Sequence, residues 1–284
     1  MKNWIFIKNK LTHPMALASL LLLVMLTIYS VLKAVDNWQW KVAVICIGIL
    51  SWFLYKDRYK HPVIWLVLFT VLLIDLYFDY FTVANHHFMF VLMVGAVISY
   101  NYHQRKDILF INIQWLLVLV IAASVLQKLM SPQFMSGDFY YFMMNRGFLF
   151  QSFMNVVPGS VEIINSNDDL FASLKKSDPN LGLTITFRDV VPNLGVICQV
   201  FAWTTIAMEL LVASALLLKP KKTWTHLLLI LMIIGILCTR IETGFMALLA
   251  ICGLMLSEKG FLKGIYVIII TGCILLIATR IGMH

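Results

Sequence analysis

The chain alternates between long apolar runs and short polar stretches along almost its whole length. A membrane-spanning helix needs about 20 predominantly apolar residues, with a range of about 17–25. Most of the runs approach or reach this length, whereas the fourth and the eighth are short and could be tilted or re-entrant. The pattern therefore predicts an all-α, polytopic bundle of about nine transmembrane helices. The predicted spans are 14–34, 39–55, 62–82, 86–100, 108–130, 192–218, 223–240, 243–256 and 261–281.

The basic residues lie in short clusters between these runs, and their spacing predicts an orientation. Short cytoplasmic loops of membrane proteins carry an excess of Lys and Arg. If the N-terminus is cytoplasmic, nine alternating spans place more than half of the 22 basic residues on that side. This predicts an N-in, C-out topology. The cytoplasmic clusters would be Lys2/Lys8/Lys10, Lys56/Arg58/Lys60, Arg105/Lys106, Lys219/Lys221/Lys222 and Lys259/Lys263.

Composition agrees with a membrane location. Of the 284 residues 61% are hydrophobic and 13% are charged, whereas soluble domains are about 45–50% apolar and about 25% charged. The net charge of +8 does not indicate a nucleic-acid partner, because the basic residues separate apolar runs and no nucleic-acid motif accompanies them. We expect membrane lipids as the surroundings. The five cysteines lie inside apolar runs without zinc-ligand spacing, so no metal site is predicted.

One long extramembrane segment, residues 131–190, would lie on the outer side of a single transmembrane domain that spans 1–284. Its polar stretches 165–169 and 175–180 are typical of turns. Its aromatic stretches 139–144 and 148–150 favour an interfacial helix or a lid on the bundle.

Ionisable residues inside or beside apolar runs are the candidates for chemistry, because a charged side chain at the centre of a span costs roughly 2.5–3.5 kcal/mol. The predicted topology gathers most of them toward the outer leaflet, so a polar cavity there should open outward. The catalytic candidates are Lys128 and Glu209, and the candidates for lining the cavity are Asp75, Asp79, His86, His87, Arg240 and Glu242.

The cavity candidates also have structural interpretations. Asp75 and Asp79 are four residues apart on one helical face, and they could pair with Lys128 or Arg240 and fix the packing of the helices. The two adjacent histidines could be interfacial, since a metal site would need a third ligand nearby. Arg240 and Glu242 could be interfacial residues with a local role.

Glu209 and Lys128 have stronger claims to function. Glu209 lies among apolar residues and needs either a partner or a proton there. Lys128 ends an apolar run at 118–126. A lysine that is partly removed from water holds its proton less tightly and could act as a base. The alternative is that Lys128 snorkels to the outer interface.

The stretch 122–129 (AASVLQKL), followed by Phe134 and Gly137, resembles a pattern in the HTTM superfamily. These membrane proteins are related to vitamin K-dependent gamma-carboxylase. Residues 207–211 (AMELL) resemble the acidic helix of that family, and 235–256 resemble its final helix pair. The resemblance covers roughly residues 108–256.

The resemblance implies that Lys128 matches the base that deprotonates the hydroquinone form of a quinone-like, lipid-soluble cofactor. It also implies modification or maturation of an exported peptide or protein at the outer face, as in bacterial relatives that mature a secreted peptide toxin. The location would be the bacterial cytoplasmic (inner) membrane. This chain departs from the family in three respects. Phe134 replaces a tryptophan, a late-helix histidine has no evident match, and no large lumenal portion follows the last span.

Three functions remain open at this point. The first is a gamma-carboxylase-like membrane enzyme or maturation factor. The second, suggested by the departures, is a non-catalytic assembly or immunity subunit that binds a membrane partner. The third is a transporter, although there is no internal repeat or matching pair of broken helices to support it.

Overall fold

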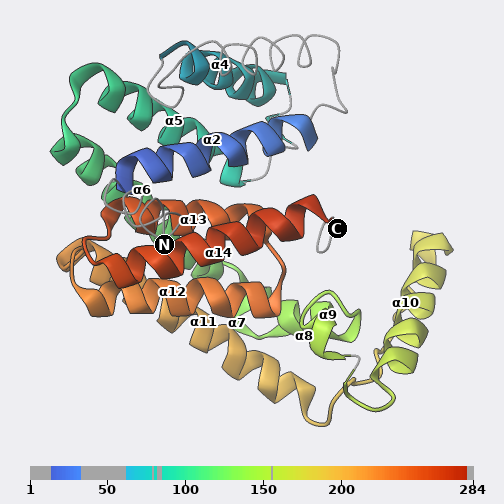
Figure 1. Cartoon of the computed structure of the whole chain (residues 1–284). Helices are drawn as coiled ribbons and strands as arrows, with labels where there is room; N and C mark the ends of the chain where they lie inside the picture. Colours follow the sequence, from blue (N-terminus) through green and yellow to red (C-terminus); the bar gives the residue numbers. More distant parts are fainter. Residues whose placement is uncertain (1–13, 33–61, 79, 82–84, 155, 280–284) are drawn as a thin grey trace. The chain divides into compact units, whose positions relative to one another are not determined.

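The computed structural model describes residues 14–32, 62–78, 80–81, 85–154 and 156–279, and all regular structure in these ranges is helical (Figure 1). The all-α prediction is therefore confirmed for this part of the chain. Each predicted span in these ranges coincides with a helix, and the predicted span 39–55 lies outside them. The helices are α2 (Pro14–Leu32), α4 (Pro62–Phe78), α5 (Asn85–His103), α6 (Lys106–Met130), α11 (Leu194–Leu218), α12 (Thr223–Thr239), α13 (Thr243–Leu256) and α14 (Gly260–Ala278).

Three of the described helices, α6, α11 and α14, are long and apolar enough to cross a membrane. Helices α2, α4, α12 and α13 are apolar over shorter lengths. The chain is accordingly a membrane protein, while the number of crossings and their direction stay predictions.

The chain divides into two compact units. The first comprises Met1–Val120, Val212–Ile233 and Glu242–His284. Its centre is α13, which packs against α14, α2 and α5, while α4 packs against α5. Helix α13 is apolar on all sides, so it is buried on all sides from Met246 to Leu256.

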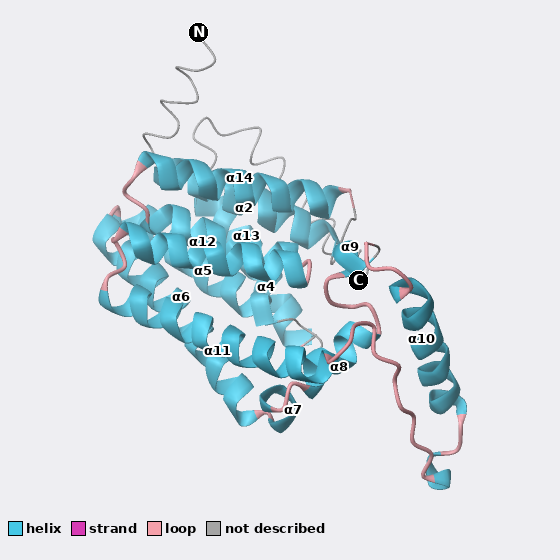
Figure 2. Ribbon diagram, turned by 90° about the horizontal axis from the view of Figure 1, so that it is seen from below, coloured by secondary structure: helices cyan, strands magenta, loops and turns pink. Residues whose placement is uncertain are grey.

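The second unit comprises Ile121–Leu211 and Ile234–Ile241. It contains the short elements α7 (Pro132–Met135), α8 (Asp138–Asn145), α9 (Gln151–Met154), α10 (Ser160–Lys176) and the 3₁₀-helix η3 (Pro179–Leu181) (Figure 2). Its core joins α7 and α8 to one face of α11. The buried core residues are Val125, Phe134, Tyr140, Met144, Leu149, Met154, Val190, Leu194, Cys198, Ala202 and Ile206.

Gly137 lets α8 lie directly on α11. It precedes α8 with φ of 85°, a conformation that side chains rarely adopt. A Cβ atom at this position would lie 2.6 Å from the backbone nitrogen of Gln199. The glycine therefore satisfies both the turn before α8 and its contact with the α11 backbone.

The turn predicted at 165–169 is wrong, because these residues lie inside α10. The reason is tertiary: the buried Asn167 side chain donates to the carbonyls of Asn145 and Arg188, at 3.0 and 2.9 Å. These bonds stabilise a helix whose local sequence favours a turn. The turn predicted at 175–180 agrees better with the structure than the one at 165–169, since α10 ends at Lys176 and η3 follows.

Candidate functional site

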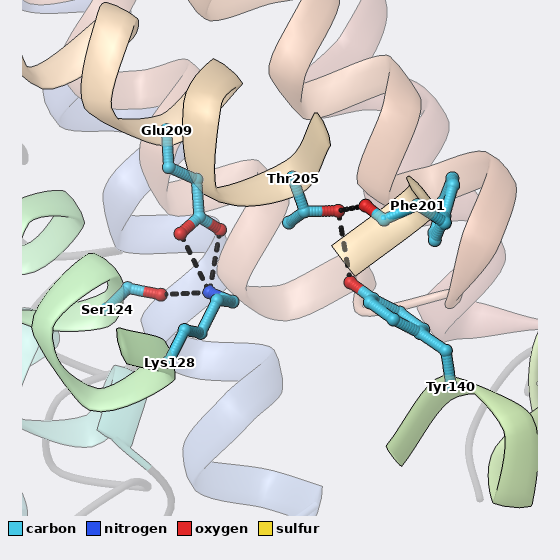
Figure 3. A network of polar contacts seen from close by, with 6 residues as sticks. All are labelled: Ser124, Lys128, Tyr140, Phe201, Thr205 and Glu209. Carbon is cyan, nitrogen blue, oxygen red and sulfur yellow. Dashed lines mark hydrogen bonds and ion pairs between the residues drawn. The ribbon is translucent and has the colours of Figure 1, made fainter. Parts of the chain in front are cut away.

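Lys128 and Glu209 form an ion pair between the last turn of α6 and the middle of α11 (Figure 3). The Lys128 Nζ donates to Glu209 Oε1 at 2.8 Å and to Oε2 at 2.7 Å. The two side chains are 19% and 8% exposed. The two catalytic candidates chosen from the sequence are thus in direct contact and largely removed from solvent.

Ser124 completes the environment of the ammonium. Its Oγ accepts a third hydrogen bond from Lys128 Nζ, at 2.5 Å. Ser124 and the two oxygens of Glu209 are therefore the three acceptor atoms in contact with the ammonium. Because Ser124 lies four residues earlier on α6, the Lys128 side chain is directed back over the preceding turn. It does not extend toward the end of the helix.

A second polar pair lies one turn away on the same face of α11 (Figure 3). The Thr205 hydroxyl donates to the carbonyl of Phe201 at 2.9 Å, so its proton is already engaged. Tyr140 on α8 must therefore be the donor in its 3.1 Å bond to Thr205 Oγ1. Burial raises the pKa of the Tyr140 phenol, which keeps it a neutral hydrogen-bond donor. Thr205 and Glu209 are four residues apart, so the phenol and the carboxylate share one helical face.

Phe134 lies between these two polar pairs. Its ring centroid is 5.6 Å from Lys128 Nζ and 5.1 Å from the ring centroid of Tyr140. Ser131 places it, because the Ser131 side chain accepts from the Phe134 backbone nitrogen at the start of α7. The apolar ring of Phe134 thus lies beside the base candidate Lys128, its partner carboxylate and the phenol donor Tyr140.

Asp75, His86 and His87 belong to the first unit, where they lie on the packed helices α4 and α5. His87 is buried, and its Nε2 donates to the carbonyl of Leu72 at 2.8 Å. Its Nδ1 therefore accepts from the Tyr29 hydroxyl, also at 2.8 Å. Both ring nitrogens of His87 are thus bonded within the protein.

The remaining sequence candidates do not form one group, and Arg240 belongs to the second unit, where its charge acts on the Tyr140 phenol. His86 packs edge-on against Tyr29, with ring centroids 5.7 Å apart. Arg240 and Glu242 lie at the connection between α12 and α13, where Glu242 precedes the first residue of α13. Asp79 lies outside the described residues. Among the residues the structure describes, no three His, Cys, Asp or Glu side chains are grouped so that they could hold a metal ion.

Sequence reasoning missed Ser124, Thr205 and Tyr140. Ser124 and Thr205 each precede a catalytic candidate by four residues, so helical spacing could have pointed to both. It also missed a buried pair in the first unit, in which His226 Nδ1 and the Tyr266 hydroxyl are 3.0 Å apart. His226 lies in the predicted seventh span, close to the basic cluster before it. At such a position the sequence pattern does not single out a histidine.

Comparison of the chain with protein-family models, with curated proteins and with solved structures found no match. The functional argument therefore rests on the side chains around Lys128.

Proposed function

We propose that the chain is a membrane enzyme in which Lys128 removes a proton from a substrate, with Glu209 as its proton-exchange partner. The supporting observation is the Lys128–Glu209 pair itself, in which the ammonium contacts both carboxylate oxygens. A charged pair shielded from water is costly to maintain. Pairs of titratable groups in such surroundings are characteristic of sites that move protons.

The proton step follows from the contacts. The ammonium of Lys128 has no free lone pair, so it must first transfer one proton to Glu209. This leaves a neutral amine beside a neutral carboxylic acid. The amine then takes a proton from the substrate, and the ammonium reforms beside the substrate anion. Tyr140, by turning its hydroxyl away from Thr205, could donate to that anion.

The site chemistry suits a weak acid that dissolves in lipid. Phe134 and the buried Val125 and Ile206 provide apolar surroundings, and one base and one phenol donor provide the polar contacts. The hydroquinone form of a quinone-like cofactor would supply an acidic hydroxyl group of this kind. Together with the resemblance to gamma-carboxylase-like proteins, this supports modification or maturation of an exported peptide or protein at the outer face of a bacterial inner membrane.

A second candidate function is favoured by one specific observation. The Lys128 ammonium is bonded to Glu209 and Ser124 within the protein, as in an ion pair that only holds two helices together. In that case the chain would be a non-catalytic subunit that assembles with a membrane partner.

The substitution Lys128→Arg separates the two functions. Arginine preserves the positive charge and the pairing with Glu209, but it cannot lose its proton in a protein. Cells producing the wild type, Lys128→Arg or Lys128→Ala would be compared by mass spectrometry of exported peptides and membrane quinones. We expect a modification that both variants lose. A modification retained in Lys128→Arg would refute the base role and favour the structural one.

A further inference from the structure

Seven basic residues gather in three short stretches of the first unit, 104–107, 219–222 and 257–263, which we call the basic end. The stretches contain the connections between α5 and α6, between α11 and α12, and between α13 and α14. The same stretches contain only two acidic residues, Asp107 and Glu258. The basic end is therefore strongly positive. Its basic residues are Arg105, Lys106, Lys219, Lys221, Lys222, Lys259 and Lys263.

The contacts of Lys221 show that the three stretches meet. Its Nζ lies 2.9 Å from Glu258 Oε1, between α13 and α14, and 4.9 Å from the centroid of the Phe110 ring, near the start of α6. One turn further along α6, the Gln114 side chain donates to the carbonyl of Leu216 at 2.9 Å. The start of α6, the end of α11 and the connection after α13 are thus in contact, so the seven cations belong to one surface.

Most of these cations have no carboxylate partner. Asp107 pairs with Arg105 at 2.8 Å, and Glu258 pairs with Lys221. Four of the other five lysines are exposed, so their charges are available to an anionic partner. These five form no ion pair with any carboxylate that the structure describes: Lys106, Lys219, Lys222, Lys259 and Lys263.

The basic end coincides with the ends of the three described helices that are long and apolar enough to cross a membrane. Helix α6 begins at Lys106, α11 ends one residue before Lys219, and α14 begins one residue after Lys259. The ends of a spanning helix lie at the level of the lipid headgroups. The unpaired lysines therefore lie where the phosphates of those headgroups are.

Exposed aromatic side chains accompany the cations. Tyr102 at the end of α5, Trp224 at the start of α12 and Phe261 at the start of α14 are 84%, 45% and 72% exposed. Tyrosine and tryptophan are enriched at membrane–water interfaces, where their rings lie among the headgroups. This combination of rings and ammonium groups fits a lipid surface better than a soluble acidic protein, which would leave the rings in water.

We propose that the basic end binds the headgroups of anionic phospholipids in the leaflet that it faces. The unpaired lysine ammonium groups donate to phosphate oxygens, in hydrogen bonds that the two charges strengthen. A lysine beside an anionic leaflet strengthens binding about fivefold, whereas a zwitterionic lipid has no net charge to attract it. The binding is independent of the proposed enzyme function.

Native mass spectrometry of the full-length protein in a neutral detergent tests this binding. The protein is titrated separately with phosphatidylglycerol, with phosphatidylcholine and with inorganic phosphate. We expect discrete complexes with phosphatidylglycerol at concentrations where the other two give none, and weaker binding as the salt concentration rises. Equal binding of the two lipids, equal binding of free phosphate, or binding that salt does not weaken would each overturn the proposal.

Two matched variants locate the surface. Lys222→Gln/Lys259→Gln removes two exposed, unpaired charges from the basic end, and Lys175→Gln/Lys176→Gln removes two exposed charges from the last turn of α10. Exposed substitutions of this kind usually change stability little, so both variants should fold. We expect phosphatidylglycerol to bind about 25-fold more weakly to the first variant and less than about threefold more weakly to the second. Equal losses, no loss in the first variant, or an acidic polypeptide bound there in place of lipid would contradict the proposal.

Discussion

Lys128 and Glu209, 81 residues apart in the sequence, meet with the ammonium bonded to both carboxylate oxygens at 2.8 and 2.7 Å. Either charged side chain would be costly to bury alone, and each charge compensates the other. The pair also ties the end of α6 to α11, so stability and chemistry depend on the same contact. Experiments on this pair must therefore separate the loss of a charge partner from the loss of a base.

A double-mutant cycle separates the loss of the charge partner from the loss of the base. Lys128→Met or Glu209→Leu alone leaves an uncompensated charge in a largely buried place, and we expect each to lower the free energy of unfolding by up to about 3–5 kcal/mol. The double variant Lys128→Met/Glu209→Leu removes both charges and should recover most of that loss while remaining inactive. Thermal unfolding in detergent provides the measurement. Additive losses in the double variant would show that the two side chains are not energetically coupled.

Gly137→Ala should be more destabilising than the same change at Gly159. Both glycines precede a helix with positive φ, 85° and 77°, and a side chain in that conformation costs about 1–3 kcal/mol. Only at Gly137 would the added Cβ also collide with the backbone of Gln199. We expect Gly137→Ala to loosen α8 from α11, measured as earlier thermal unfolding. Equal losses in the two variants would mean that the contact with α11 contributes nothing.

The positions of the apolar described helices could be predicted from the sequence because long apolar runs in a membrane protein have few alternatives to a helix. Lys128 and Glu209 could be singled out because charges in such runs are rare. Their pairing could not be predicted, since it depends on where α6 and α11 approach each other. The sequence pattern suggested instead that Asp75 and Asp79 could pair with Lys128 or Arg240.

The outer segment was harder to predict because its structure depends on contacts between distant residues. Local propensity at 165–169 favours a turn, but three hydrogen bonds of Asn167 to Asn145 and Arg188 hold it in a helix. The aromatic stretch at 139–144 was predicted to be an interfacial helix or a lid. It forms α8 and packs in the core of the second unit, while its relation to the membrane surface stays a prediction.

Asn167→Asp should release the segment that follows α10. The asparagine amide donates to two carbonyls and accepts from one backbone nitrogen, whereas a carboxylate would face both carbonyls without donors. An unsatisfied buried group costs about 1–3 kcal/mol, and more if it is charged. We expect faster proteolysis near residues 182–190. Asn165→Asp, an exposed change on the same helix, should leave the cleavage rate unaltered; comparable acceleration there would rule out a specific role of Asn167.

Gly253→Ala should destabilise the first unit, because an added Cβ would overlap the ring of Tyr266, which packs against α13. The ring is fully buried and its hydroxyl contacts His226, so it has little room to move. Overpacking of this kind typically costs about 1–3 kcal/mol. Gly272→Ala on α14, where no atom lies within 4 Å of the new Cβ, should change stability by less than about 1 kcal/mol. Similar melting temperatures for both variants would contradict a tight contact at Gly253.

Tyr141 should make the second unit sensitive to alkali. Burial, together with the hydrogen bond from its hydroxyl to Asp189 and the charge of that carboxylate, raises the pKa of Tyr141 from 10.0 to about 12. The unfolded chain loses this proton first, so the stability contributed by Tyr141 is fully present below pH 10 and falls as the pH rises toward 12. Alkaline unfolding of the wild type and Tyr141→Phe should therefore differ in this range, and Asp189→Asn should lower the pKa of the phenol. A phenol that titrates near pH 10 in the folded protein would contradict the Asp189 contact.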